Sequence, residues 1–243
     1  MRITRLYLPE KISCGEKTQL DKNTSNHLIR VLRTKVNSPL ILFNGDGFEY
    51  LAVTLDENTK KTSVLIESKS RVDNESNLSI TLIQGMSRQD RMETSVQKSV
   101  ELGVNKIIPV LCQRSNLRLN PEKISKKLSH LRSIAVSASE QSGRCIVPEI
   151  TDLCSIENMG QHFSKQSIKI TLEPKAEKSL KDFTLSDNSV VIFIGPEGGL
   201  NEEELLHLKE QNFETVRFGP RILRTETAGP AVISAMQILW GDL

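Results

Sequence analysis

A run of five apolar residues, Val190 to Ile194, is followed at once by a break in the hydrophobic pattern. Such a short run, mostly β-branched, is typical of a buried strand, and the sequence Gly195-Pro196-Glu197-Gly198-Gly199 ends it. Asn201 and the three glutamates after it have the pattern of an N-cap with an acidic first helical turn. We therefore predict a strand, a glycine-rich loop that exposes backbone N–H groups, and a helix that begins after Asn201.

The same pattern occurs a second time downstream. Thr215 to Phe218 predicts a short strand, Gly219-Pro220 breaks it, and the sequence RILRTETAG leads into an apolar helix from Pro230 to Leu239. We expect two adjacent strand ends that offer backbone atoms to one site.

Strands and helices alternate in the segment before these loops. The predicted strands are Leu78 to Ile83, Ile107 to Leu111 and Ile168 to Leu172, and the predicted helices run from about Asp90 to Leu102, before Gly103, and from Asn120-Pro121 to about Ala138. Such alternation predicts an α/β fold with a mostly parallel sheet covered on both faces. Ligands bind at the carboxyl ends of the strands in open sheets of this kind.

The front of the chain has a different pattern, with short strands and one helix. Strands are predicted from Arg2 to Leu8, Leu40 to Phe43, Phe48 to Val53 and Thr62 to Glu67, and a short helix capped by Thr24 or Ser25 carries His27, Leu28, Val31 and Leu32. The turn Asn44-Gly45-Asp46-Gly47 is a strong hairpin signal. We predict a small β-barrel over residues 1–72, a polar linker at Arg71 to Asn77, and an α/β domain over residues 73–243.

Composition limits the class of protein. A chain of 243 residues with 37% hydrophobic and 26% charged residues is ordinary for a globular protein, and no segment has the roughly 20 continuous apolar residues of a membrane span. We expect no membrane association and a cytoplasmic location. The net charge is only +2, but residues 1–72 carry 12 basic against 8 acidic residues. This excess of basic residues in the N-terminal segment fits either an RNA-binding surface or a mildly basic surface that is simply solvated.

Neither the cysteines nor the histidines form a pattern that indicates chemistry. Cys14, Cys112, Cys145 and Cys154 include no C-x-x-C pair and no nearby histidine, so we expect reduced, mostly buried thiols and no metal. His27, His130, His162 and His207 lack a neighbouring nucleophile motif.

A single glycine-rich loop between a strand and a helix is as often a tight turn as a binding loop. The first loop lacks the Lys-Ser/Thr ending of a P-loop, Glu197 would repel a phosphate, and the spacing is not G-x-G-x-x-G. A nucleotide-dependent phosphotransferase is therefore disfavoured.

The two loops together narrow the choice. IGPEGG followed by FGPRILRTETA resembles the C-terminal cofactor loops of SPOUT-class RNA methyltransferases, and the chain is most similar to the ribosomal RNA small subunit methyltransferase E family, which makes 3-methyluridine in 16S ribosomal RNA. The stretches RMETSVQKSVELGVNKIIPVLCQRS, SEQSGR and HLIRVLR agree with it. One departure is that Asn37-Ser38-Pro39 stands where a turn glycine is expected.

The resemblance implies a PUA-like RNA-binding β-barrel, a SPOUT domain with a C-terminal trefoil knot, a homodimer, and S-adenosylmethionine bound without a metal. Three loops would hold this methyl donor: Thr171 to Pro174, Ile194 to Gly199 and Phe218 to Thr225. The expected cofactor-binding residues are Thr171, Leu172, Glu173, Ile194, Gly195, Glu197, Gly198, Gly199, Phe218, Gly219, Leu223 and Thr225.

The expected chemistry places two residues in catalytic positions. Arg224 would stabilise charge on the uracil oxygens, the alternatives being a phosphate contact or an ion pair with Glu226. Glu197 would accept a hydrogen bond from a ligand hydroxyl or act as a base; the alternative is a structural role in closing its own loop.

The expected partner is 16S ribosomal RNA in the assembled small subunit, and the expected contacts to this RNA involve mainly basic residues. They are Arg5, His27, Arg30, Arg33, Arg88, Arg91, Arg114, Gln141, Arg144 and Arg221, with ordinary solvation as the alternative. A non-catalytic RNA-binding assembly factor is the second hypothesis for function, and it would bind RNA without the cofactor.

Overall fold

The chain folds into two units, each with its own hydrophobic core. In the computed structural model, which describes residues 3–115, 120–164 and 167–243, one unit comprises Met1–Glu75 with Ser139–Val147, and the other Ser76–Ala138 with Pro148–Leu243. The first unit thus includes a segment far along the sequence, which the predicted division after residue 72 did not contain.

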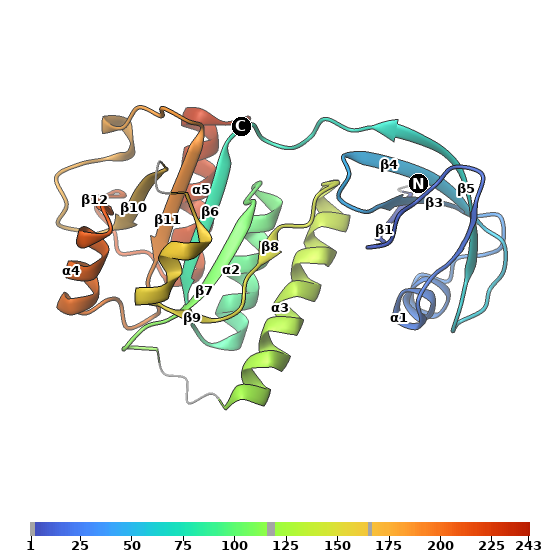
Figure 1. The fold of residues 1–243 in the computed structure, drawn as a ribbon, viewed down its shortest axis with the longest axis horizontal. Helices are drawn as coiled ribbons and strands as arrows, with labels where there is room; N and C mark the ends of the chain where they lie inside the picture. The colour runs from blue at the N-terminus through green and yellow to red at the C-terminus, as the bar shows by residue number, and fades with distance from the viewer. Residues whose placement is uncertain (1–2, 116–119, 165–166) are drawn as a thin grey trace. The chain divides into compact units, whose positions relative to one another are not determined.

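The first unit is built on a five-stranded sheet (Figure 1). Its strands are β1 (Thr4–Tyr7), β2 (Lys17–Gln19), β3 (Pro39–Phe43), β4 (Phe48–Thr54) and β5 (Ser63–Arg71). The order is β1-β3-β4-β5-β2, with β1 parallel to β3 and the other pairs antiparallel. Alternate residues point into one core, including Leu6, Leu40, Leu42, Ala52, Val64 and Ile66.

The hairpin predicted between β3 and β4 is confirmed. Gly45 and Gly47 both have positive φ, at 94° and 82°, which is the conformation that glycine allows at no steric cost. Strand β5 is longer than predicted, because Arg71 still pairs with Phe48, so the linker begins after this residue. Arg2, the predicted start of the first strand, lies outside the described residues.

The short helix is capped differently from the prediction. Helix α1 (Lys22–Asn26) begins at Asp21, whose carboxylate accepts hydrogen bonds from the backbone N–H groups of Asn23 and Thr24 at 2.7 and 3.1 Å. It continues as a π-helical turn, η1 (His27–Val31). Ser25 is buried and donates to the Leu20 carbonyl, so it is not free to cap. The turn without a glycine is formed by Asn37, which adopts φ 60°.

The second unit contains a parallel sheet, as the alternating pattern predicted. Its strands are β6 (Ser79–Gly85), β7 (Lys106–Leu111), β8 (Glu149–Ile150), β9 (Cys154–Ser155), β10 (Ile168–Leu172), β11 (Ser189–Ile194) and β12 (Glu214–Val216). The order is β12-β10-β11-β6-β7-β8, β9 pairs with β7, and all pairs are parallel. The short β8 and β9 had no signal in the sequence pattern.

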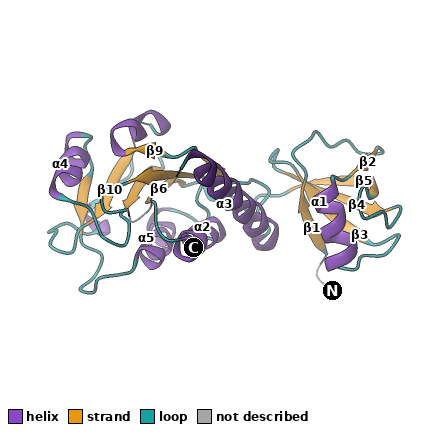
Figure 2. Cartoon of the chain, turned by 90° about the horizontal axis from the view of Figure 1, so that it is seen from below, coloured by secondary structure: helices purple, strands orange, loops and turns teal. Residues whose placement is uncertain are grey.

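Helices cover both faces of this sheet. They are α2 (Gln89–Glu101), α3 (Pro121–Ser142), α4 (Glu202–Glu210) and α5 (Thr225–Trp240), with 3-10 turns η2 (Ile156–His162) and η3 (Leu180–Asp182). Figure 2 shows α2 and α5 on one face and α4 on the other. On the α4 face, Val191 and Phe193 of β11 pack with Met159 and Leu208. In the part of the chain that the structure describes, none of these helices has the length and apolar content needed to cross a bilayer.

The predicted start of helix α4 is confirmed, but helix α5 begins earlier in the sequence than predicted. Asn201 caps α4 in a capping box with Glu204. Helix α5 begins at Thr225, five residues before the predicted Pro230, which stands inside it. Proline there removes one backbone hydrogen bond. The turn before it forms because Thr225, Ala228 and Gly229 are buried.

Candidate functional site

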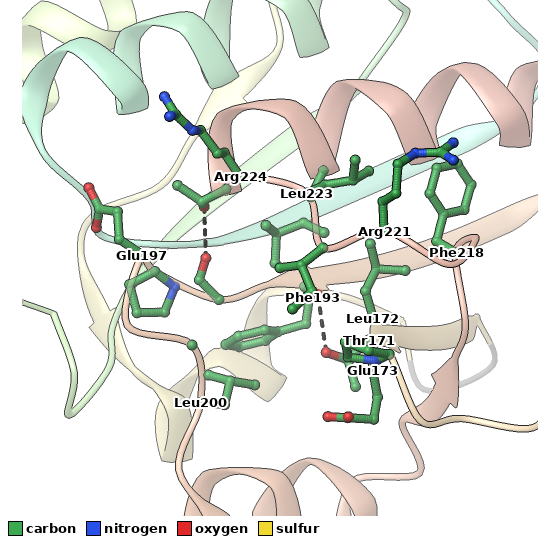
Figure 3. Close-up of a pocket in the computed structure, with 18 of the residues that line it drawn as sticks. Thr171, Leu172, Glu173, Phe193, Glu197, Leu200, Phe218, Arg221, Leu223 and Arg224 are labelled. Atoms are coloured by element: carbon green, nitrogen blue, oxygen red, sulfur yellow. Dashed lines mark hydrogen bonds between the residues drawn. The ribbon is translucent and has the colours of Figure 1, made fainter.

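The carboxyl ends of β10, β11 and β12 open onto one cavity of about 450 Å³ (Figure 3). The two glycine-containing loops predicted from the sequence both line it, together with the loop after β10. The prediction that β11 and β12 are adjacent is wrong, since β10 pairs with both and lies between them. Order along the sequence does not determine order in a sheet, and the third expected loop, Thr171 to Pro174, follows the strand that lies in the middle.

All but one of the predicted cofactor-binding residues line this cavity. They are Thr171, Leu172, Glu173, Ile194, Gly195, Glu197, Gly199, Phe218, Gly219, Leu223 and Thr225. Gly199 and Gly219 have positive φ, and a Cβ atom at either would meet no protein atom within 4 Å. These two loops therefore leave space next to their backbone, which a ligand can use.

Gly198 is the exception, because it faces Arg114 and not the cavity. A Cβ atom at Gly198 would lie 2.8 Å from the Arg114 Cβ. The Arg114 guanidinium donates to the carbonyls of Gly198 and Leu200, both at 3.2 Å. Arg114 is exposed, but this contact also gives it a role in holding the loop.

The Glu197 side chain is held by the segment that follows β6. Its Oε1 accepts a hydrogen bond from the Arg88 backbone N–H at 2.9 Å and lies 3.6 Å from Arg91 Nη1. Arg91 also lies 4.0 Å from Glu226 in the first turn of α5. This geometry favours the loop-closing alternative for Glu197 over a free carboxylate that acts as a base.

Arg224 and Arg221 stand at the cavity with no partner among the described side chains. Both are exposed and line the cavity, and neither forms an ion pair or side-chain hydrogen bond with a described residue. The alternative ion pair of Arg224 with Glu226 is therefore not formed. In Figure 3 the Arg224 side chain extends on the Glu197 side of the cavity and that of Arg221 on the Phe218 side.

A lysine that the sequence reasoning did not single out lies behind this site. Lys127 Nζ donates to the Ser87 carbonyl at 2.7 Å. Burial lowers the pKa of Lys127, and the nearby carboxylates of Glu197 and Glu93 act in the opposite direction. Its α3 position gave no signal, because a lysine in an amphipathic helix is normally solvated.

Two of the predicted RNA contacts are turned inward in the first unit. Arg5 contacts Glu49 and donates to the carbonyls of Gly143 and Arg144 at 3.1 and 3.0 Å. The Arg144 side chain is 5% exposed and lies 2.6 Å from Glu75. Both guanidinium groups thus have partners inside the protein, and this geometry gives no support to the predicted contact of these two arginines with RNA.

The other predicted RNA contacts are accessible or lie at the cavity. His27, Arg30, Arg33, Arg88 and Gln141 are exposed. Arg91 and Arg221 line the cavity, although Arg91 is engaged by the two glutamates described above. Among the described residues there is no group of three histidine, cysteine or carboxylate side chains able to hold a metal ion.

Comparison with known proteins decides the family. The RNA methyltransferase domain family matches residues 74–237, and the RNA methyltransferase PUA domain family matches residues 20–67. A ribosomal RNA small subunit methyltransferase E from Buchnera aphidicola subsp. Schizaphis graminum is 34% identical over 100% of this chain and 98% of that protein. The chain belongs to the ribosomal RNA small subunit methyltransferase E family. A relative of the same name from Bacillus subtilis is 31% identical over 89% of the chain and 90% of that protein.

Solved structures extend this agreement to the fold of the family. The crystal structure of a ribosomal RNA small subunit methyltransferase E from Neisseria gonorrhoeae, bound to S-adenosyl methionine, has a TM-score of 0.92 and 37% identity, and the match covers both chains completely. A Legionella pneumophila protein in complex with the cofactor SAM has a TM-score of 0.96 and 35% identity, again over both full chains.

The sequence also carries a signal for the part of β6 that lies beneath the loop after β11. Gln84 and Gly85 interrupt the apolar strand β6, and an isolated glycine in a strand indicates close approach of another backbone. A Cβ atom at Gly85 would lie 2.6 Å from the Pro196 N atom and 2.9 Å from the Gly195 carbonyl carbon. The loop after β11 therefore rests directly on Gly85.

Proposed function

We propose that this protein is a 16S ribosomal RNA (uracil-N3)-methyltransferase, which transfers the methyl group of S-adenosylmethionine to N3 of one uridine in the small ribosomal subunit. The observation that carries the proposal is the cavity where the loops after β10, β11 and β12 converge. The S-adenosyl methionine in the related Neisseria gonorrhoeae structure supports the choice of cofactor.

The cavity has the properties that S-adenosylmethionine requires. Its volume of about 450 Å³ is within the range of small-molecule sites. Leu172, Ile194, Leu200 and Phe218 give it apolar walls for an adenine ring. The Glu173 carboxylate and the open backbone of the glycine loops supply the polar contacts that orient a ligand.

Catalysis is required mainly at the uracil that accepts the methyl group. S-adenosylmethionine, when bound, supplies a methyl group activated by a positively charged sulfur. Uracil N3 has to lose its proton to a base before its electron pair can bond to that methyl carbon as the bond from carbon to sulfur breaks. The negative charge left on the deprotonated uracil spreads to the two carbonyl oxygens that flank N3. Donors already aimed at developing charge are usually the largest catalytic contribution. We assign this role to Arg224, which lies at the cavity and has no side-chain partner among the described residues.

Glu197 has a different role in this proposal. Its carboxylate is bound to the Arg88 N–H and faces Arg91, so it fixes the loop after β11 against the start of α2. This arrangement keeps the backbone of Gly195 at the cavity wall. The Lys127 ammonium behind it adds positive charge close to the site.

We further propose that residues 1–72 form the RNA-binding domain and residues 73–243 the catalytic domain. The exposed His27, Arg30 and Arg33 offer positive and hydrogen-bonding groups on the first domain, while Arg88 and Arg221 would guide the target strand to the cavity. Phosphate contacts of this kind position the RNA and do not read its sequence.

The family resemblance supports three further parts of the proposal: a trefoil knot in the last third of the chain, a homodimer, and work on the assembled subunit in the cytoplasm. The homodimer also has support in an apolar groove lined by Leu180, Phe218, Ala235, Ile238 and Leu239. Ile238 and its neighbour Leu239 are 66% and 41% exposed in this groove, and contiguous exposed apolar side chains mark interaction surfaces. Light scattering of the purified protein would give twice the mass of one chain, and the monomer mass would exclude the dimer.

Substitution of Arg224 tests the catalytic assignment. At saturating RNA and cofactor, Arg224→Ala should lower the single-turnover rate of methyl transfer by about 10²- to 10³-fold, with S-adenosylmethionine affinity unchanged. Arg224→Lys keeps the charge but loses the planar fork, so it should recover only part of the rate. Arg71→Ala is the matched control, because Arg71 is exposed and lies outside both the cavity lining and the apolar groove. Wild-type turnover in Arg224→Ala with a raised Michaelis constant for RNA would make Arg224 a binding residue only.

A further inference from the structure

Gln84 is a buried polar side chain at the carboxyl end of β6, directly beneath the cavity. It is 1% exposed, although its neighbours in the strand are mainly apolar. Its Oε1 accepts a hydrogen bond from Ser95 Oγ of α2 at 2.7 Å, and its Nε2 donates to Thr225 Oγ1 of α5 at 3.0 Å. A buried amide costs free energy unless it is hydrogen-bonded, and here both ends of the amide are satisfied.

The hydrogen bonds continue in one direction to the cavity wall. Thr225 Oγ1 accepts from Gln84 and donates its own proton to the Gly195 carbonyl at 2.7 Å. Gly195 lines the cavity in the loop after β11, and Thr225 directly follows Arg224 in sequence. One chain of donors thus runs from Ser95 through Gln84 and Thr225 to Gly195, and Gln84 is its central member.

This series of hydrogen bonds connects two parts of the site whose separation has to be fixed. One part is the loop that begins at Gly195, and the other is the turn that carries Arg224. The second link between them is the Arg91 guanidinium, 3.6 Å from Glu197 and 4.0 Å from Glu226, in a partly exposed position. Partly exposed ion pairs at such distances contribute little. The buried hydrogen bonds are therefore the stronger link.

We propose that Gln84 is a positioning residue for methyl transfer: through Thr225 it holds the Gly195 loop and the Arg224 turn at a fixed separation. The proposal rests on the proposed function of this cavity. Gln84 lines no part of the cavity wall. Its Nε2 also donates to the Gly85 and Ile194 carbonyls, at 3.3 and 3.5 Å, but the hydrogen bond to the Thr225 hydroxyl is the shortest that Nε2 makes and the one that reaches the Arg224 turn. Because misplacement by about 1 Å can lower a rate by about 10²-fold, loss of this link should reduce turnover even with substrates saturating.

The test is Gln84→Met, which keeps the length of the side chain and removes every hydrogen bond of the amide, to Ser95, Thr225 and the Gly85 and Ile194 carbonyls. Gln237→Met is the matched control, because Gln237 is also 1% exposed and bonds to Ser76 Oγ and the Leu102 carbonyl, away from the cavity. Both variants should lower the melting temperature. Only Gln84→Met should lower the single-turnover rate, by at least about 10-fold, and weaken S-adenosylmethionine binding measured by calorimetry.

Thr225 provides a second test if Gln84→Met does not fold. Thr225→Val removes the hydroxyl without changing the shape, and Thr225→Ser retains it. The valine variant should reproduce the loss of rate, and the serine variant should recover it. Where Gln84→Met does fold, its loss and that of Thr225→Val should not add when the two substitutions are combined.

The outcomes separate this inference from the proposed function. If the wild-type protein binds no S-adenosylmethionine and methylates no RNA, the proposed function fails. If the wild type is active and Gln84→Met and Thr225→Val both match Gln237→Met, with lower melting temperature and normal rate and affinity, Gln84 is only a structural residue and the inference is wrong.

Discussion

Gly85→Ala adds a single methyl group at the closest backbone contact of the site. The new Cβ would lie 2.6 Å from the Pro196 N atom, 2.7 Å from its Cδ and 2.9 Å from the Gly195 carbonyl carbon. The optimum for such contacts is about 3.5–4.0 Å. The contacted atoms belong to a backbone and a proline ring, so no flexible side chain can move away. The loop after β11 has to shift by about 1 Å.

Two effects of this shift can be estimated. Overpacking of this kind costs about 1–3 kcal/mol of unfolding free energy, which for a chain of this size corresponds to a melting temperature lower by roughly 2–4 °C per kcal/mol. A 1 Å displacement of the loop should also lower methyl transfer by about 10²-fold. The second effect is the larger one for function, since the shifted residues line the cavity.

Gly229→Ala is the matched control for this prediction. A Cβ at Gly229 in α5 would meet Ser95, Gln84 and Leu82 atoms at 3.6, 3.7 and 3.8 Å, which are ordinary contacts. Alanine in a helix is favoured over glycine by about 1 kcal/mol, so this variant should be as stable as the wild type or more stable. Calorimetric titration with S-adenosylmethionine and a single-turnover assay compare the two. Wild-type affinity and rate in Gly85→Ala would refute the reasoning.

Three further predictions concern other parts of the molecule. Burial raises the pKa of the Glu140 carboxyl above its ordinary value of 4.5, so ionisation of this group lowers the stability of the fold as the pH rises above that value. Glu140→Gln should therefore melt at a higher temperature than the wild type at neutral pH but not below about pH 4. An equal melting temperature at neutral pH would contradict this prediction. A thiol reagent should label the exposed Cys14 first, while Cys112, whose pKa burial raises to about 12, should react only on unfolding; equal rates in the native protein would exclude the described burial. Replacing both Arg30 and Arg33 by alanine should weaken RNA binding and flatten its salt dependence without changing cofactor affinity, and an unchanged salt slope would remove them from the interface.

Features set by neighbouring residues were predictable from the sequence. The N-cap at Asn201 and the two glycines of the β3–β4 hairpin follow from local chemistry, and both form as expected. The cavity loops were found for the same reason, because Pro and Gly interrupt apolar strands at Gly195 and Gly219. Local sequence was sufficient wherever the partners of a residue lie within a few positions of it.

Features set by distant contacts were not predictable. The position of β10 between β11 and β12 depends on the packing of the whole sheet. Arginine is normally a surface residue, but the charges of Arg5 and Arg144 are neutralised inside the first unit by ion pairs with Glu49 and Glu75. Gly198 lies in a loop that lines the cavity on one side only, and the side that Gly198 faces depends on its contact with Arg114, which is distant in sequence.

The most direct test of the proposed function is methylation of small ribosomal subunits that lack this modification, with the modified nucleotide identified. Purified protein and S-adenosylmethionine should produce one 3-methyluridine per 16S ribosomal RNA, detected by mass spectrometry of nucleosides and mapped by primer extension, since an N3 methyl group blocks base pairing. Omission of the cofactor should abolish the product. Methylation on a ribose, on another base or on another uracil atom, or binding to the subunit without any methyl transfer, would contradict the account.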